Sequence, residues 1–247
     1  ENHNFKSKTD TEIILEQYLH FGVSAFEKLN GMFAFALFDR KNQSVFLVRD
    51  RLGIKPLFYF QSDDFLIFSS EIKALKSFVD LNEIEYSSLP EWSYYGNSLS
   101  NRTLYKGVSQ LLPGHYIKVD LDNFSFEQKK YWSPSQIKFT KSAKGLDAGQ
   151  IIKQTKKLLD ESVERQLIGD VPVGIFLSGG VDSSAITAIA SNYYNKKIDT
   201  FSVGFDYELG EGELGKAAYV AKLFNTNHHS LRVTGYDIAD TVQELVR

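Results

Sequence analysis

The stretch Ser-Gly-Gly-Val-Asp-Ser-Ser at positions 178–184 carries the strongest chemical signal in the sequence. It follows an apolar run and opens a segment with helical spacing. Unpaired backbone N–H groups and the positive end of the helix dipole would therefore lie beside it. Gly179 and Gly180 would let bare backbone approach an anion, and the serine hydroxyls would add donors. The pattern predicts a phosphate or pyrophosphate site.

Asp182 lies inside this stretch and would repel a bare phosphate. We therefore expect it to act through a metal ion that the phosphate holds. The stretch is not a Walker loop, because no Gly-Lys-Ser/Thr follows it. The alternative is a plain Gly-Gly turn with a serine helix cap. The full string, in its strand–loop–helix context, favours phosphate binding.

The elements that must position this stretch alternate between helix and strand. Such alternation predicts crossover connections and a parallel sheet, which means a doubly wound α/β domain. Within it, His228 and His229 are neighbours on a predicted strand and would point to opposite faces, which favours a structural role over a metal site. The predicted elements are helix 149–167, strand 171–177, helix 184–194, strand 198–203, helix 213–224 and strand 228–233.

The first half of the chain is rich in short strands, and its continuous apolar runs suggest strands covered on both faces. Arg49-Asp50-Arg51 is best explained as a charged turn that holds Gly53 and Pro56, with no chemistry assigned. The predicted elements are helices 10–21 and 70–78, and hairpins formed by 32–38 with 44–48, by 57–60 with 65–69, and by 116–121 with 124–131.

Composition excludes several classes of function. With 28 basic and 31 acidic residues among 247, the formal net charge of −3 argues against a nucleic-acid binder with a broad basic face. No apolar run approaches the roughly 20 residues that span a membrane. The chain has no cysteine, so it contains no disulfide and no thiol nucleophile. With no secretory segment, we expect a cytoplasmic location. Because Glu1 stands where a methionine would start a protein, we expect an internal fragment.

Several motifs together resemble one family. The stretch 178–184 is similar to the pyrophosphate loop of ATP pyrophosphatases, and its flank from Asp170 to Ser178 is similar to that of glutamine-dependent asparagine synthetases. The segments that resemble the glutaminase domain of this family are 29–39, 49–59, 69–75 and 112–115.

The resemblance implies an α/β protein made of two joined enzymatic domains. The first is a layered α+β class II glutamine amidotransferase domain of the N-terminal-nucleophile fold, which releases ammonia from glutamine. The second is an ATP-pyrophosphatase domain that uses ATP and magnesium to convert aspartate into an aspartyl adenylate, which ammonia converts into asparagine. We expect the first domain at 1–132 without its N-terminal portion, a linker at 133–148, and the second domain at 149–247 without its C-terminal portion.

The resemblance also assigns site residues. Val203 would meet the adenine, Phe176 or Leu177 would pack on its other side, and Asp182 would reach magnesium. Asp10 would hold the α-ammonium of glutamine, although its pattern alone fits a helix cap. The nucleophile of the family is an N-terminal cysteine, so we assign no catalytic residue here and expect this fragment alone to lack glutaminase activity. The expected ATP and pyrophosphate residues are Phe176, Leu177, Ser178, Gly179, Gly180, Asp182, Ser183, Ser184 and Val203.

Two alternatives to an asparagine synthetase stay open. One is a related amidotransferase that acts on another carboxylate, such as a sugar or antibiotic precursor. The other is a non-catalytic nucleotide-binding fragment. The expected partners are the small molecules glutamine, aspartate and ATP, with neither nucleic acid nor membrane. A homodimer is compatible with the resemblance, and the sequence does not decide it.

Overall fold

The computed structural model describes residues 5–137, 145–206, 212–238 and 241. The chain divides into two compact units, unit 1 at residues 1–138 and unit 2 at residues 139–247, and each is considered by itself. Residues 138–144 of the predicted linker lie outside the described residues. Within the described ranges, no helix combines the length and the apolar character that a membrane crossing needs.

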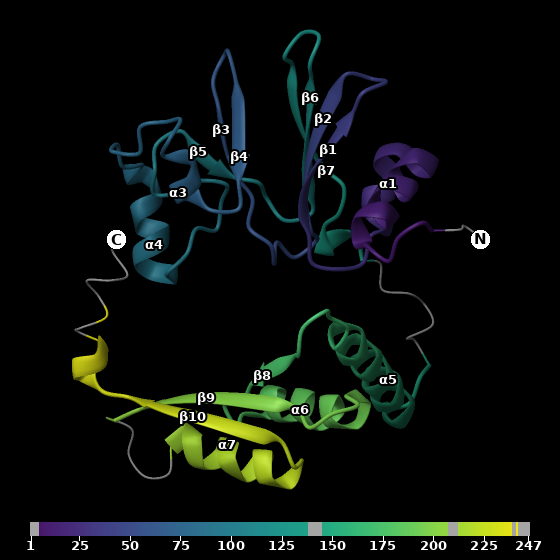
Figure 1. Cartoon of the computed structure of the whole chain (residues 1–247), viewed down its shortest axis with the longest axis vertical. Coiled ribbons are helices and arrows are strands. Elements are labelled where there is room, and N and C mark those ends of the chain that lie inside the picture. Colours follow the sequence, from purple (N-terminus) through teal and green to yellow (C-terminus); the bar gives the residue numbers. More distant parts are fainter. Residues whose placement is uncertain (1–4, 138–144, 207–211, 239–240, 242–247) are drawn as a thin grey trace. The chain divides into compact units, whose positions relative to one another are not determined.

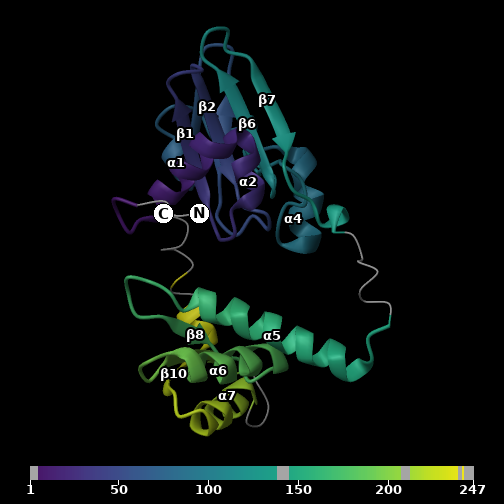
Figure 2. The ribbon, with the colours of Figure 1, turned by 90° about the vertical axis from the view of Figure 1, so that its right-hand side faces the viewer.

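Unit 1 contains two antiparallel sheets, with the strand orders β1-β2-β6-β7 and β4-β3-β5. Helices α1 and α2 pack on one face of the four-stranded sheet, as Figure 2 shows. The elements, drawn in Figure 1, are α1 (Asp10–Phe21), α2 (Ala25–Lys28), β1 (Ala34–Asp39), β2 (Ser44–Arg49), β3 (Phe58–Gln61), β4 (Leu66–Ser69), α3 (Ile72–Leu75), α4 (Leu89–Tyr95), β5 (Val108–Gln110), β6 (His115–Asp120) and β7 (Phe126–Lys130), with 3₁₀ turns at Gly22–Ser24, Tyr86–Ser88 and Pro134–Gln136.

Strand β2 is buried on both faces. On one face Phe46 packs against Phe26 of α2, whose ring centre lies 5.9 Å from that of Phe46 and 5.4 Å from that of Tyr116. On the other face Leu47 packs with Leu57 in a second apolar cluster. A strand covered on both sides has no polar face, which explains why its sequence does not alternate.

Strand β1 behaves differently, because among the described residues it pairs only with β2 and lies at the edge of the sheet. Leu37 is buried, whereas Phe38 on the opposite face is 53% exposed. The expectation that this apolar run is covered on both faces is therefore wrong for Phe38.

The three predicted hairpins are confirmed, with ends that shift by one or two residues. Helix α3 is much shorter than the predicted 70–78. Helices α2 and α4 and strand β5 were not predicted. A signal for α4 was present, since Pro90 lies in its first turn and Gly96 follows its last residue with a left-handed φ of 65°.

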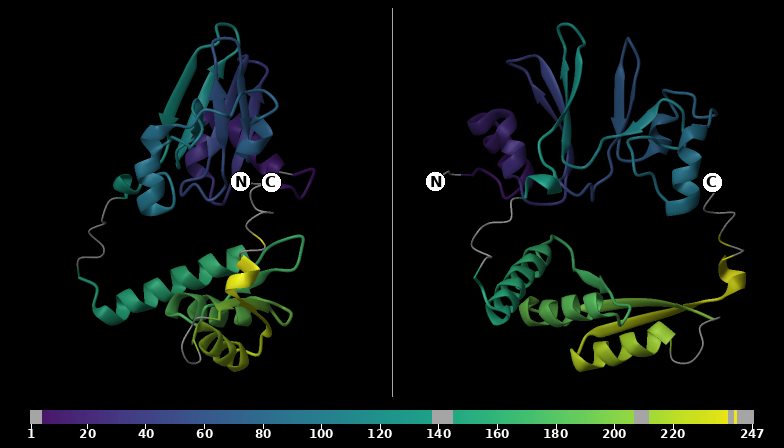
Figure 3. Two further views of the ribbon diagram at one scale, coloured as in Figure 1. Left: turned by 90° about the vertical axis from the view of Figure 1, so that its left-hand side faces the viewer. Right: turned by 180° about the vertical axis from the view of Figure 1, so that it is seen from behind.

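Unit 2 is a parallel sheet with the strand order β10-β9-β8, as the alternating pattern predicts. Helices α6 and α7 lie against one face of this sheet (Figure 3). On that face Leu177 packs against Ala217 and Ala221 of α7, and on the opposite face Phe176 and Phe201 are exposed. The elements are α5 (Ala148–Gln166), β8 (Gly174–Phe176), α6 (Val181–Tyr193), β9 (Asp199–Phe205), α7 (Gly212–Leu223) and β10 (Asn227–Val233).

Two boundaries in unit 2 differ from the predictions and matter for the site. Strand β8 is shorter than the predicted 171–177, in part because Pro172 has no N–H to donate to a neighbouring strand. Helix α6 begins at Val181 and not at 184, with Gly180 as the N-cap residue. Asp182 and Ser183 therefore lie in the first turn of the helix.

Candidate functional site

The loop between β8 and α6 is held at its start by strand β9. The backbone N–H of Leu177 donates to the carbonyl of Phe201 at 2.8 Å, and the Ser202 hydroxyl donates to the carbonyl of Leu177. The Leu177 side chain is only 1% exposed and lies against α7. These contacts place the loop at the carboxyl edge of the parallel sheet, where ligands of open α/β sheets bind.

The two glycines of the loop have different structural roles. Gly179 has a φ of +75°, and a Cβ placed on it would lie 2.5 Å from the Cβ of Lys216 and 2.7 Å from the backbone nitrogen of Ala217. Only glycine fits this position. Gly180 has a φ of −72°, and the nearest atom to a Cβ there would be the Ser178 hydroxyl at 3.4 Å. The fold therefore does not require a glycine at position 180. Its lack of a side chain leaves the neighbouring backbone N–H groups accessible.

The serines of the loop form a small network around this bare backbone. The Ser178 and Ser183 hydroxyls lie 3.0 Å apart, and the Ser183 hydroxyl also donates to the carbonyl of Gly180 at 3.3 Å. The backbone N–H of Ser184 makes the first helical bond, to Gly180 at 3.0 Å.

Several donors of this loop stay unused. Within the described part of the chain, the backbone N–H groups of Val181, Asp182 and Ser183 have no acceptor, as expected for the first turn of a helix. The Asp182 carboxylate is exposed and has no protein partner there. The loop thus presents free donors for an anion and a free carboxylate for a metal ion bound to that anion.

The residues expected around the adenine separate into buried and exposed positions. Phe176 is 84% exposed and Val203 is 44% exposed, on the face of the sheet that α6 and α7 leave open. Leu177 points to the other face and is buried under α7. Of the two residues considered for one side of the base, Phe176 is the one whose side chain is accessible.

The adjacent histidines have separate surroundings, as their strand position predicts. The Nδ1 of His228 lies 3.0 Å from the Thr200 hydroxyl, which lies 2.8 Å from that of Thr226, and burial lowers the pKa of His228. The Nε2 of His229 lies 2.9 Å from the carboxylate of Asp199, and hydrogen bonds to His229 lower the pKa of Asp199. The described residues contain no cluster of three or more metal-ligating side chains.

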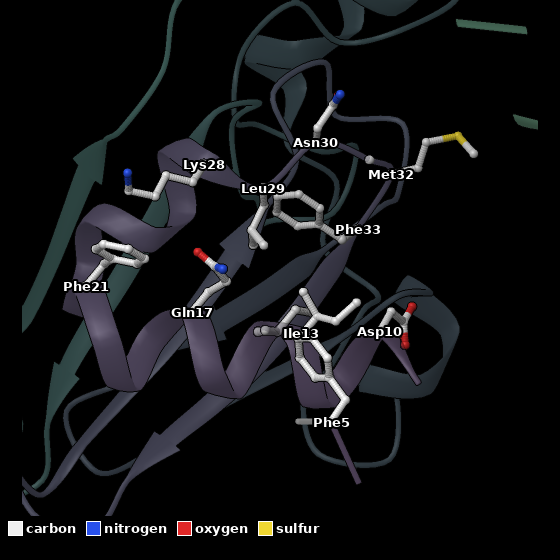
Figure 4. Close-up of a pocket in the computed structure, with 12 residues that line it drawn as sticks. Phe5, Asp10, Ile13, Gln17, Phe21, Lys28, Leu29, Asn30, Met32 and Phe33 are labelled. Atoms are coloured by element: carbon white, nitrogen blue, oxygen red, sulfur yellow. The ribbon is translucent and has the colours of Figure 1, made fainter. Parts of the chain in front are cut away.

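Asp10, the expected glutamine residue, lies in unit 1 at the mouth of a cavity of about 760 Å³ (Figure 4). The cavity is lined largely by apolar side chains of α1 and of the segment that precedes β1. Asp10, Gln17, Lys28 and Asn30 supply polar groups. Its volume falls within the usual range for small-molecule sites.

The structure does not give Asp10 a capping role. Thr9 is the N-cap residue of α1, and Glu12 accepts the backbone N–H groups of Lys6 at 2.7 Å and Ser7 at 2.6 Å. Among the described residues, the Asp10 carboxylate accepts only one long hydrogen bond, from the Thr11 hydroxyl at 3.5 Å. It is exposed and remains available to a ligand.

The Arg49-Asp50 corner of unit 1 is structural, as expected from the sequence. The guanidinium of Arg49 donates to the carbonyls of Lys55 at 2.8 Å, Leu111 at 2.6 Å and Gly53 at 2.7 Å. Asp50, which is 1% exposed, accepts three backbone N–H groups from the following turn.

Sequence reasoning missed the neighbours that the fold brings to each site. Lys216 lies beside Gly179, and Gln17 and Asn30 share the cavity with Asp10. An Asn-Gly pair at positions 30–31 was a weak signal for a turn near Asp10. For Lys216 the sequence offers no signal, because tertiary packing alone brings α7 to the loop.

Comparison with known proteins agrees with this arrangement. Residues 1–132 match the glutamine amidotransferase domain family, and residues 154–247 match the asparagine synthase family. "Asparagine synthetase [glutamine-hydrolyzing] 3" of Bacillus subtilis is 33% identical over 99% of this chain and 41% of its own length. "Amidase chyE" of Penicillium rubens is 32% identical over 98% of this chain and 37% of its own length.

Among solved structures, the glutamine phosphoribosylpyrophosphate amidotransferase of B. subtilis matches with a TM-score of 0.36 and 12% identity, over 93% of this chain and 40% of that chain. A likeness this loose carries no argument. The chain spans about two fifths of the length of the curated relatives named above. The match over 1–132 covers more than half of the chain. The chain therefore belongs to the glutamine amidotransferase domain family, and to those members in which an asparagine synthase domain follows.

Proposed function

We propose that this chain is part of a glutamine-hydrolysing asparagine synthetase, an ATP-dependent amide ligase. Glutamine and water give glutamate and ammonia at unit 1. Aspartate and ATP give aspartyl adenylate and pyrophosphate at unit 2. Ammonia then displaces AMP from the adenylate and leaves asparagine. The observation that carries the proposal is the free-donor loop at 178–184, placed at the carboxyl edge of a parallel sheet in a chain that also matches an amidotransferase domain.

The loop fits the triphosphate of ATP with its magnesium. The unused N–H groups of the first turn of α6, with the hydroxyls of Ser178, Ser183 and Ser184, would hold phosphate oxygens. Asp182 would hold the magnesium ion, which neutralises phosphate charge when bound. Val203 and Phe176 would border the adenine, and Leu177 would only position the loop, packed under α7. Its buried position supports this last assignment.

Glutamine would bind in the cavity beside Asp10. The carboxylate of Asp10 does not cap helix α1 and lines a cavity with apolar and amide side chains, which supports a role in holding the α-ammonium of the substrate. Replacing Asp10 by asparagine keeps the shape and removes the charge. The expected result is a higher KM for glutamine with unchanged synthesis from free ammonia.

A second candidate differs in the acceptor. The similarity to a protein called amidase chyE, at nearly the same identity as to an asparagine synthetase, favours keeping open an amidotransferase that acts on another carboxylate. Both candidates share the loop chemistry, so only the acceptor separates them.

The test is pyrophosphate release by the complete protein that carries this chain, with ATP, magnesium and free ammonia, and with aspartate or a panel of other carboxylates as acceptor. We expect release with aspartate, with asparagine as the product. Release with another carboxylate alone would support the second candidate, and no release with any acceptor would favour a non-catalytic nucleotide-binding protein.

We further propose that the protein is cytoplasmic and forms a homodimer. Light scattering coupled to size exclusion tests the dimer, which a monomeric mass would refute. Cell fractionation tests the location.

A further inference from the structure

We propose that Lys216, on helix α7, is a phosphate-binding residue of the loop at 178–184 and supplies the positive side chain that the loop itself lacks. This inference rests on the proposed function, because it takes the loop to bind the triphosphate of ATP and the pyrophosphate that leaves.

Helix α7 is packed closely enough on the loop to place Lys216. A Cβ on Gly179 would overlap the backbone of Lys216 and Ala217, since it would lie 2.8 Å from the carbonyl carbon of Lys216. A Cβ on Gly204 of β9 would likewise lie 2.5 Å from the Cγ of Leu214. With Leu177 packed on Ala217, these contacts hold the first half of α7 against the loop and the sheet.

At this position, Lys216 leaves α7 beside the bare backbone of the loop. Its Cβ lies 2.5 Å from where a Cβ of Gly179 would stand, yet the side chain as a whole is exposed. Throughout the described ranges, no carboxylate lies within ion-pair distance of Lys216. The flexible four-carbon stem of a lysine can carry its ammonium across a loop of this size.

Charge balance explains why such a residue is needed. Between Gly174 and Ser184 the only charged side chain is Asp182, which is negative. Pyrophosphate is a polyanion, and N–H groups with one bound magnesium ion leave part of its charge unbalanced. A Walker loop carries its own lysine for this purpose. Here the neighbouring helix presents the lysine instead.

The first measurement is the affinity of the complete protein for inorganic pyrophosphate with magnesium, by calorimetric titration. We expect Lys216→Met to weaken binding about tenfold, which is the scale of one charge-assisted hydrogen bond. Lys216→Arg keeps the charge and should stay within about threefold of wild type. Lys222→Met is the matched control. It lies on the same helix, is also exposed, and the variant should bind pyrophosphate as wild type does.

The second measurement separates this inference from the proposed function. If wild type releases pyrophosphate with ATP and aspartate but Lys216→Met binds pyrophosphate as wild type does, the lysine assignment is wrong and the proposed function stands. If wild type neither binds nor releases pyrophosphate, both are wrong. If Lys216→Met lowers the melting temperature, Lys216→Gln and Lys216→Arg decide: equal affinities for these two variants would overturn the charge argument.

Discussion

Two corners of this molecule look alike in sequence and differ in what they can do. Each follows a strand, and each contains a glycine with positive φ and an aspartate. In the corner after β2, Asp50 is buried and accepts three backbone N–H groups. In the corner after β8, Asp182 is exposed, and the N–H groups around it have no protein acceptor within the described residues.

The difference distinguishes a structural loop from a candidate binding loop. Buried polar groups are normally satisfied within the protein, and leaving one unpaired costs about 1–3 kcal/mol. The corner at Asp50 uses its hydrogen-bonding capacity to hold the fold. In the corner at Asp182, the backbone N–H groups and the carboxylate stay exposed, where a ligand can bind them. Substitutions at the two corners should therefore act on different quantities.

The largest expected effect is on stability, from Asp50→Ala. It orphans three backbone N–H groups and should lower the unfolding free energy of unit 1 by about 3 kcal/mol or more. Both tryptophans, Trp92 and Trp132, lie in unit 1, so urea unfolding followed by tryptophan fluorescence reports on this unit. Asp182→Ala is the control and should change the far-UV transition by less than about 0.5 kcal/mol. Equal losses of unfolding free energy for Asp50→Ala and Asp182→Ala would show that the two corners do not differ in their structural role.

The next effect separates the glycines of the binding loop. Gly179→Ala forces a side chain into α7 at positive φ and should cost about 2 kcal/mol or more in the stability of unit 2. Gly180→Ala meets no atom closer than 3.4 Å and should cost less than about 1 kcal/mol. Urea unfolding followed by far-UV dichroism measures both. The contrast fails if Gly180→Ala is the more damaging change.

A comparable effect on activity is expected from Gly180→Val. The protein should fold, because the position is open, but the branched side chain would cover the donors of the first turn of α6. The rate of pyrophosphate release with aspartate and free ammonia should fall roughly 30-fold, which corresponds to a loss of about 2 kcal/mol of transition-state stabilisation. Glutamine hydrolysis by the complete protein should persist. A rate of pyrophosphate release near that of wild type would support the alternative explanation of the loop, a plain glycine turn with a serine helix cap.

The smallest effect is a pH dependence in unit 2. Burial lowers the pKa of His228 below its ordinary value of 6.5, with the neighbouring His229 adding to the shift. The unfolded chain then takes up a proton at a higher pH than the folded chain does. Stability should therefore fall as the pH drops below about 6.5. Asp199, whose lowered pKa lies below 3.8, titrates outside this window.

This prediction is checked by urea midpoints of the far-UV signal at pH 7.5 and pH 5.5. The decrease between the two should be smaller in His228→Gln, which removes the titrating ring. An equal decrease in both proteins would show that the hydrogen-bonded side chains of His228, Thr200 and Thr226 do not control the pH dependence of stability.

Much of the fold follows from local sequence. The hairpins at β1–β2, β3–β4 and β6–β7 were predicted from apolar runs and turn residues, and the parallel unit was predicted from alternating strands and helices. Helix α4 and strand β5 were missed. Strand β5 has only three residues and exists through its pairing with β3, which no local pattern reveals.

The candidate loop was also predicted from sequence, down to its seven residues, although α6 begins three residues earlier than expected. What its members do individually was not predicted. The two glycines are equivalent in sequence, and only the packing of α7 makes Gly179 obligatory. Phe176 and Leu177 are adjacent apolar residues, and only the position of α7 decides which of them is buried.

The sequence by itself therefore determined most of the elements and which segment is the candidate phosphate-binding loop, because turns, helix starts and glycine-rich loops depend on neighbouring residues. Tertiary structure decided which polar groups are satisfied and which stay free, since that depends on segments far apart in the chain. Asp50 and Asp182 have the same carboxylate and similar sequence settings. Their roles differ because one is enclosed by its own turn and the other is left exposed in the first turn of α6.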